Sequence, residues 1–368
     1  MISSLKNIKS SCQLWLRRHF VKIKSIDELY QDVQKLSPIP KEIIYTPELE
    51  KIPISKNSLK YIQKDKFVTP DIYSITLSNA IYYAKYETVM SKDRQIIAES
   101  MRNPSKFEKF SLRTTYLKKT EKISGFCSVF RSHTNYKNYY HSLIDYIPRV
   151  YLLNQPEYRD IPKIKLLVSS PLTKIEKFFL SKLLPKNVVI KIVNPENIYQ
   201  IEKLIFPSFL CTLKSGYLPE PYLNYFSDKF IPKREAKKTH RIFISRKPNN
   251  HGRCLLNEDD LLPVLEKYGF SRYYPEEFSF EEQIELFYDA EIVIGVHGYA
   301  LVNLIFSRKI KVLELCSTDK IITNFYLLSK SVGNNHEFLQ NTNPAKKHYD
   351  DYYLDISKLS NYLESFLD

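Results

Sequence analysis

Short apolar runs alternate with amphipathic segments along the C-terminal part of the chain, and this alternation restricts the fold more than any other feature of the sequence. Between residues 241 and 316, the runs RIFIS, SRYYP, EIVIG and KVLELC have the length and composition of strands. The segments NEDDLLPVLEKYG, SFEEQIELFYDA and YALVNLIF lie between them and are predicted to be helices. Strands that alternate with helices of this length form a parallel sheet through right-handed crossovers. The sequence therefore predicts a Rossmann-like α/β domain in this region.

A second α/β segment precedes this one. KIKLLVSS, NVVIKIV and KLIFPS read as strands, PLTKIEKFFLSKLL reads as a helix opened by Pro171, and residues 71–100 read as antiparallel strands. Residues 214–240 lack a sustained period and read as a linker. We therefore expect two α/β domains in series, at residues 37–232 and 233–345. A basic segment at residues 1–36 precedes them, and a C-terminal helix at residues 346–368 follows them.

The charge of the chain favours anionic partners. Its 55 basic and 41 acidic residues give a net charge of +14. Six of the excess positive charges lie in residues 1–24, whose apolar residues recur at helical spacing. Such a helix could lie on an anionic membrane surface, but it could equally dock on its own domain or form a loose basic tail. A secretory signal is disfavoured because charges interrupt the apolar run.

Cysteine usage and hydropathy indicate the compartment. The five cysteines are scattered and include no C-x-x-C pair, which favours a reducing environment over disulfides or a zinc site. No stretch approaches the ~20 consecutive apolar residues that span a bilayer. We therefore expect a cytoplasmic protein that could also be peripheral on the inner surface of the membrane.

Two glycines stand close together, the first at the end of EIVIG and the second three residues later, in a chain with only 7 glycines among 368 residues. Gly295 would permit a tight turn, and Gly298 would remove a side chain where a phosphate approaches the backbone. His297 lies between them and can donate a hydrogen bond to a phosphate or a sugar. The helix that follows would direct its first N–H groups at the anion. This pattern predicts an anion site, although a tight turn with a satisfied histidine would have the same sequence.

Further polar residues are expected at the same edge of the sheet, because open parallel sheets bind ligands beyond the carboxyl ends of their strands. Ser245 ends RIFIS and Arg246 follows it, and Arg246 offers two parallel donors that match a phosphate. Glu314 lies near the end of KVLEL and would accept from ribose hydroxyls, unless it is a solvated or capping acid. Gln283 and Asn303 could face the nucleotide.

The segment NYYHSLIDYIPR carries the other group of polar residues. His141, Asp145 and Arg149 are spaced i, i+4, i+8, so on a helix they form one polar stripe among apolar residues. Titratable groups on a mostly buried helix are costly unless they are paired or useful. Pro148 would kink the helix and direct the His–Asp pair into a cleft. The alternative is the ordinary solvent face of an amphipathic helix.

These segments match a family pattern in order. The motif N-x-x-H-x-x-x-D-x-x-P-R occurs at residues 138–149 and includes Asn138. ISR, LLNEDDL, YPEEFSFEEQIELFYDAEIVIG and H-G-x-A-L-x-N follow it. Over residues 120–320 the chain resembles the family 61 glycosyltransferases, which include bacterial capsular-polysaccharide transferases. Two positions depart from the family pattern: Ser142 stands where bacterial members often have Trp, and Tyr299 replaces a small residue after His-Gly.

The resemblance implies the GT-B architecture, in which two Rossmann-like domains face an inter-domain cleft and the C-terminal domain holds the nucleotide-sugar. It also implies an inverting transfer from a nucleotide-sugar, which we expect to be UDP-linked, to a hydroxyl of a glycan or glycoconjugate. Polysaccharide biosynthesis, including that of capsules, is the expected context. No cofactor and no metal ion are expected, and the sequence contains no D-x-D to hold a metal pyrophosphate.

Roles follow for the residues at both segments. Asp145, or His141 oriented by Asp145, would act as the general base. Asn138 and Arg149 would support the cleft or contact the acceptor. The residues expected to bind the donor are Ser245, Arg246, Gln283, Gly295, His297, Gly298, Asn303 and Glu314.

Two other functions compete with this interpretation. A non-catalytic binding protein for nucleic acid or anionic glycan, on a degenerate form of the same fold, would use the charge of +14 and the 28 tyrosines. The basic residues are spread along the chain and form no nucleic-acid motif, so no nucleic-acid partner is expected. An epimerase or hydrolase would need a redox-cofactor loop or a catalytic water site, and the sequence shows neither.

Overall fold

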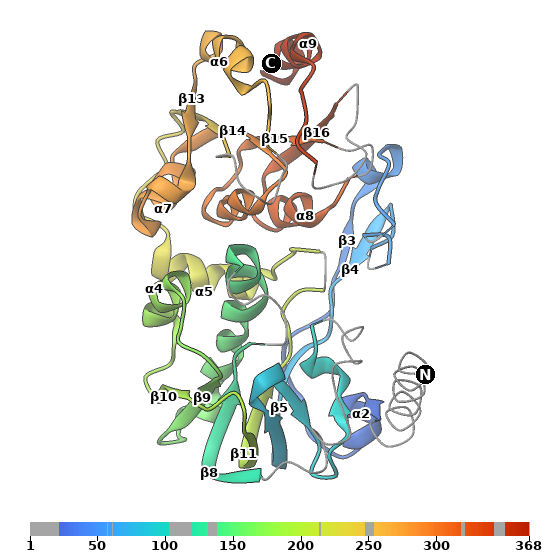
Figure 1. The fold of residues 1–368 in the computed structure, drawn as a ribbon, viewed down its shortest axis with the longest axis vertical. Helices are drawn as coiled ribbons and strands as arrows, with labels where there is room; N and C mark the ends of the chain where they lie inside the picture. The colour runs from blue at the N-terminus through green and yellow to red at the C-terminus, as the bar shows by residue number, and fades with distance from the viewer. Residues whose placement is uncertain are drawn as a thin grey trace, which may run out of the picture. The chain divides into compact units, whose positions relative to one another are not determined.

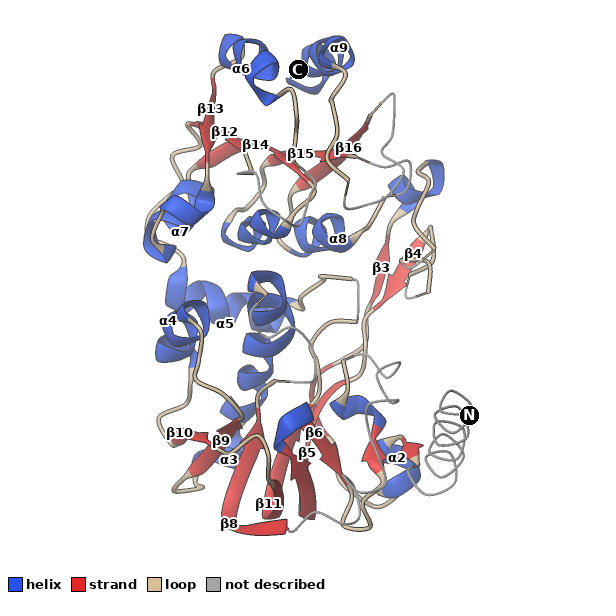
Figure 2. Cartoon of the chain, in the orientation of Figure 1, coloured by secondary structure: helices blue, strands red, loops and turns tan. Residues whose placement is uncertain are grey.

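A computed structural model of the chain describes residues 22–56, 58–60, 62–102, 120–131, 138–212, 215–246, 254–317, 321–341 and 350–367. The chain divides into two compact units, which are drawn with their secondary structure in Figures 1 and 2. Unit 1 contains residues 1–40 and 71–210, and unit 2 contains residues 41–70 and 211–368. Most of the basic segment at residues 1–24 lies outside the described residues, so its predicted membrane contact stays a prediction.

Unit 2 is built on a five-stranded parallel sheet, as the alternation of strands and helices predicts. Its strands are β12 (His240–Ile244), β13 (Phe270–Tyr273), β14 (Ala290–Val296), β15 (Lys311–Cys316) and β16 (Asn335–Gln340). Their order is β13-β12-β14-β15-β16. The chain therefore builds outward in one direction from β12 and in the other from β14. Sheets of this order bind ligands at the point between these two strands where the direction reverses.

Helices cover both faces of this sheet (Figure 1). α6 (Glu258–Lys267) and α9 (Ile356–Leu367) pack on one face, through a core that includes Leu261, Leu313 and Leu363. α8 (Asn324–Ser331) and a 3₁₀ helix, η9 (Tyr299–Phe306), lie on the other face. α7 (Phe280–Tyr288) begins with the predicted capping box between Ser279 and Glu282.

Unit 2 also takes in segments whose structure the sequence reading missed. α5 (Glu220–Phe230) forms in the stretch predicted to be a linker. The ribbon of β3 (Ile43–Tyr45) and β4 (Lys66–Val68) and the 3₁₀ turn Pro47–Lys51 come from far upstream. Leu49 and Phe67 share a core with Leu327, and Ile54 bridges to Ile321. These contacts explain why the compact units differ from the predicted domain limits at residues 37, 232 and 345, the last of which lies outside the described residues.

Unit 1 is built on a nine-stranded mixed sheet. Its parallel part has the order β11-β8-β9-β10, with β8 (Thr120–Val129), β9 (Ile164–Val168), β10 (Val188–Ile192) and β11 (Ile198–Pro207). β5 (Ile72–Tyr83), β6 (Thr88–Met90) and β7 (Ile96–Ile97) continue the sheet as the predicted antiparallel strands. β1 (Ile23–Lys24) and β2 (Leu36–Ile39) complete it. Unit 1 is therefore α/β but only partly Rossmann-like.

The α-helices in the described part of unit 1 are short: α2 (Ile26–Leu29), α3 (Pro156–Arg159) and α4 (Lys174–Leu183). They are accompanied by 3₁₀ turns at Ala84–Tyr86 and Ala98–Ser100 and by the π-helical and 3₁₀ segments His141–Tyr146 and Ile147–Asn154. α2 has the capping box predicted from Ser25 and Glu28. α4 begins at a capping box between Thr173 and Glu176 rather than at Pro171, because the Thr173 hydroxyl accepts from the backbone N–H of Glu176. Among the described residues, no helix is long and apolar enough to cross a membrane.

Candidate functional site

The carboxyl ends of the unit 2 strands bring together the residues that the sequence predicts to bind the donor. Ile244 of β12 pairs with Gly295 of β14, and Gly295 pairs with Glu314 of β15. Arg246 follows β12 by two residues, and the His297–Gly298 turn follows β14. The expected gathering of these residues at one edge is therefore present, and it coincides with the reversal point of the strand order.

The two glycines of the turn differ in what an added Cβ would contact. A Cβ on Gly295 would lie 3.0 Å from Leu301 Cδ2 and 3.3 Å from Ile244 Cβ, so this glycine lets η9 approach β12. A Cβ on Gly298 would lie 3.2 Å from Arg246 Nη1. Gly298 has extended backbone (φ −175°), so the turn does not require positive φ there. The predicted reason for Gly295, a tight turn, is therefore replaced by helix-to-strand packing.

Arg246 is the most informative side chain at this edge. Its Nε and Nη1 are buried and have no hydrogen-bond partner among the residues that the structure describes. Its Cζ lies 5.7 Å from the centre of the Tyr299 ring, and Tyr299 is 44% exposed. A guanidinium with unmatched buried donors is costly unless a ligand pairs with them. The arrangement is suited to an anion with several oxygens, such as a phosphate.

The sequence predicted that Glu314 would accept from ribose hydroxyls, but both of its carboxylate oxygens are engaged by histidines. It is fully buried, one carboxylate oxygen contacts His297 Nδ1, and the other lies 3.0 Å from His336 Nε2. Burial alone would raise the pKa of Glu314, but its interactions with His297 and His336 lower that pKa to about 2. The carboxylate is therefore ionised, and it contacts the His297 ring at Nδ1.

Three other predicted donor-binding residues are engaged inside unit 2. Ser245 donates through Oγ to the carboxylate of Glu258, at 2.6 and 2.7 Å. Asn303 is fully buried and donates to Gln283 Oε1 at 2.7 Å, which ties η9 to α7. Gln283 also donates to the carbonyl of Phe278. In this structure these side chains support the edge, so their contact with a nucleotide stays a prediction.

In unit 1, a π-helical turn holds the predicted histidine–aspartate pair. η6 (His141–Tyr146) is π-helical, and the N–H of Ile147 bonds to the carbonyl of Ser142, five residues earlier. Pro148 follows and cannot donate, and the chain tightens into the 3₁₀ helix η7 (Ile147–Asn154). The expected kink is thus a change of helix type. His141 Nδ1 lies 2.6 Å from Asp145 Oδ2.

Arg102 completes this pair, and the sequence reading missed it. Its Nη2 lies 2.7 Å from Asp145 Oδ1, and both side chains are almost fully buried. Burial alone would raise the pKa of Asp145, but the charge of Arg102 and the hydrogen bond with His141 lower it to about 2. Asp145 is therefore a buried anion, whereas the side chain of His141 is 26% exposed. Arg102 lies 43 residues upstream, so no local spacing indicates the contact.

Asn138 and Arg149 have local contacts that fit the supporting half of their predicted role. Asn138 Oδ1 accepts from the N–H of Tyr140 at 2.9 Å and so caps the start of the helical segment. Arg149 is buried and donates to the carbonyl oxygens of Phe130 and Pro207, which fixes the ends of β8 and β11. Contact of either residue with an acceptor stays a prediction.

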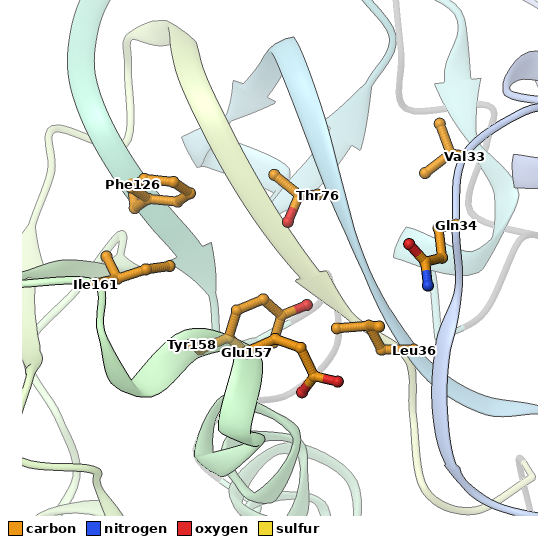
Figure 3. Close-up of a pocket in the computed structure, with 8 residues that line it drawn as sticks. All are labelled: Val33, Gln34, Leu36, Thr76, Phe126, Glu157, Tyr158 and Ile161. Atoms are coloured by element: carbon orange, nitrogen blue, oxygen red, sulfur yellow. The ribbon is translucent and has the colours of Figure 1, made fainter.

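A separate pocket of about 410 Å³ opens on unit 1 (Figure 3). Its lining combines side chains of β2, β5, β8 and α3 and contains none of the predicted site residues; the lining residues are Val33, Gln34, Leu36, Thr76, Phe126, Glu157, Tyr158 and Ile161.

In the described ranges, no group of three or more His, Cys, Asp or Glu side chains is arranged to hold a metal ion. Metal independence of the chain stays a prediction.

One family model matches a stretch of the chain that contains residues of both units. Residues 139–313 match the family model described as Glycosyltransferase 61. The matched region contains both the His141–Asp145 pair and the edge formed by Arg246 and Gly298. The family resemblance drawn from the motifs is confirmed by this match. A search of curated proteins returned no match to the chain.

Proposed function

We propose that the chain moves a sugar from a nucleotide-sugar, which we expect to be UDP-linked, to a hydroxyl of a glycan or glycoconjugate. The match of residues 139–313 to the Glycosyltransferase 61 family model supports this proposal. The observation that carries this proposal is Arg246, whose buried Nε and Nη1 have no partner among the described residues. A diphosphate would satisfy both nitrogens. The GT-B arrangement of the two units stays part of this proposal.

His141 is the proposed general base, and Asp145 is the residue that orients it. Of the two, only His141 is partly exposed, and Asp145 is held between Arg102 and His141. An ionised carboxylate on Nδ1 keeps the proton there, which leaves Nε2 to accept a proton. This assignment supports the second of the two alternatives drawn from the sequence.

The proposed reaction is a single displacement that inverts the sugar carbon. The acceptor oxygen forms a bond to that carbon as its proton moves to Nε2 of His141. The bond between the carbon and the phosphate oxygen breaks, and its electron pair leaves with the nucleoside diphosphate. Arg246 and the backbone amides after Gly298 would stabilise the charge that develops on this leaving group.

A nucleotide-sugar screen tests the function directly. We expect one donor among UDP-, GDP-, CMP- and dTDP-linked sugars to raise the Tm of the protein, because a ligand that binds only the folded state stabilises it by mass action. At 100 times its Kd, that donor would add about 2.7 kcal/mol to the free energy of unfolding. The measurement is a thermal-shift series over donor concentration. No Tm change with any nucleotide-sugar, together with salt-sensitive binding to random DNA, would instead favour the basic binding protein.

Metal independence is a separate prediction. Since Arg246 and the turn at Gly298 supply the positive charge for the leaving group, we expect turnover in excess EDTA to stay within about twofold of the untreated rate. Release of nucleoside diphosphate, measured after gel filtration into EDTA buffer, checks this result. A rate that falls at least tenfold and returns with added Mg²⁺ or Mn²⁺ would reject the metal-free mechanism without rejecting glycosyl transfer.

The cellular setting is also a proposal. Capsule or other polysaccharide biosynthesis follows from the family resemblance alone. A cytoplasmic position, peripheral to the inner membrane surface, is supported by the scattered cysteines and by the basic residues 1–24.

A further inference from the structure

Four polar side chains form a continuous hydrogen-bonded series inside unit 2, and the series ends at His297, at the edge where the donor is expected. Glu314 contacts His297 through one oxygen and His336 through the other. His336 Nδ1 lies 2.8 Å from Ser329 Oγ. The side chains of Glu314 and His336 are fully buried, and that of His297 is 12% exposed. The series therefore connects the interior of the unit to the ligand edge.

The parallel register explains how these residues meet. Glu314 pairs with Gly295, two residues before His297, and His336 pairs with Val312, two residues before Glu314. Residues two apart on a strand share a face, so Glu314 and His336 lie on the same face of the sheet. α8 covers this face: it supplies Ser329 and places Phe325 against the ring of His297, with ring centres 5.1 Å apart.

Charge fixes the direction of the hydrogen bonds. Because Glu314 is ionised, each histidine nitrogen that faces it carries its proton and donates a hydrogen bond to the carboxylate. In the neutral form of His336, Nε2–H then donates to Glu314, and Nδ1 accepts from the Ser329 hydroxyl. With both oxygens engaged, the carboxylate holds the His297 ring by Nδ1–H and turns Nε2 to the opposite side of that ring.

We propose that His336 is a positioning residue for the donor site: with Ser329 it fixes Glu314, and Glu314 sets the ring of His297 so that Nε2 faces the diphosphate of the nucleotide-sugar. His297 donates to the diphosphate in its imidazolium form, in which Nδ1–H is bonded to Glu314 and Nε2 carries the second proton. This inference rests on the proposed function, because that function supplies the ligand. A carboxylate and a histidine buried in a sheet cost stability compared with apolar side chains. Their connection to a partly exposed histidine beside Gly298 gives them a role at the ligand edge.

The test compares two substitutions at one buried position. His336→Gln keeps an amide N–H that can donate to Glu314, whereas His336→Leu fills the space without a donor. We expect His336→Leu to weaken UDP binding about tenfold, because losing the groups that orient a ligand-binding histidine typically lowers affinity by at least this factor. His336→Gln should bind UDP within about twofold of the unsubstituted chain. Calorimetric titration with UDP, GDP and ADP separately measures the affinities. Ser329→Ala, a smaller change with an expected loss of about threefold, replaces His336→Leu if that variant does not fold.

A second readout does not depend on nucleotide binding. The ¹⁵N chemical shift of His297 Nδ1, measured without ligand, should move in His336→Leu and return in His336→Gln. Unchanged shift and unchanged affinity in His336→Leu would overturn the positioning role. If the unsubstituted protein binds no nucleoside diphosphate, the proposed function and the assigned ligand both fail, while the ¹⁵N shift still decides whether His336 controls His297.

Discussion

Asp145→Asn is expected to lower kcat by roughly 10³–10⁴-fold while nucleotide binding is retained. The carboxylate accepts from His141 on one side and from Arg102 on the other. An Asn side chain that turns its oxygen to Arg102 must turn its amide N–H groups to His141. Nδ1 of His141 would then have to accept, the ring proton would move to Nε2, and the ring could no longer take a proton from the acceptor. The rate of nucleoside diphosphate release with the donor found by the screen measures this effect.

A matched control separates chemistry from folding. Asp289 is another aspartate with a pKa lowered to about 2, by its hydrogen bond with Arg234 in unit 2. Asp289→Asn breaks an ion pair of the same kind without touching the proposed base, so its kcat should stay within about threefold. If Asp145→Asn keeps more than a tenth of the turnover, or loses nucleotide binding instead, the role assigned to the His–Asp pair is wrong.

Arg246→Ala is expected to weaken nucleoside diphosphate binding by about 100-fold, because each charge-assisted hydrogen bond contributes roughly 1.5–3 kcal/mol and tenfold in affinity corresponds to about 1.4 kcal/mol. The substitution also removes two buried nitrogens that have no partner in the part of the chain that the structure describes, so the free energy of unfolding of the ligand-free protein should stay the same or rise. Calorimetry with UDP and chemical unfolding measure the two quantities.

The comparison variants for this prediction are Arg246→Lys and Arg272→Ala. Lysine restores the charge but not the planar pair of donors, so its affinity should fall between those of the alanine variant and the unsubstituted chain. Arg272 pairs with Glu258 at the surface of the same unit, and its removal should leave binding unchanged. Equal UDP affinity in Arg246→Ala and the unsubstituted chain would contradict binding of the diphosphate at this edge of the sheet.

The sequence was most informative where one local rule decides the outcome. The periodicity of residues 241–316 predicted the parallel sheet of unit 2, and the strand-end rule placed Arg246 beside Gly298. The i, i+4 spacing placed His141 on Asp145. Each of these inferences needs only neighbouring residues or the common direction of parallel strands.

The inferences that failed needed contacts between distant segments. Arg102 and His336 lie in no motif, and their importance comes from reaching Asp145 and Glu314 across the fold. Glu314 was expected to point outward because acids on such sheets often bind ribose, but two histidines enclose it. α5 was missed because prolines and lysines interrupt its short amphipathic pattern. Its Phe226 stacks on Phe306, a residue distant in the sequence, and local spacing does not indicate such a contact.

The division of the chain into units has a consequence for biosynthesis. Leu49 and Phe67 lie in a core with Tyr326 and Leu327, more than 250 residues later. The contacts that define unit 1 are made among residues up to 210, so we expect this unit to fold while the ribosome is still making the rest, with residues 41–70 as an insertion whose packing partners have not yet been made. The apolar side chains of residues 41–70 therefore have no α8 to pack against until that helix has been synthesised. A polypeptide stopped at the predicted boundary near residue 232 would therefore expose the apolar side chains of this stranded segment and invite aggregation or proteolysis.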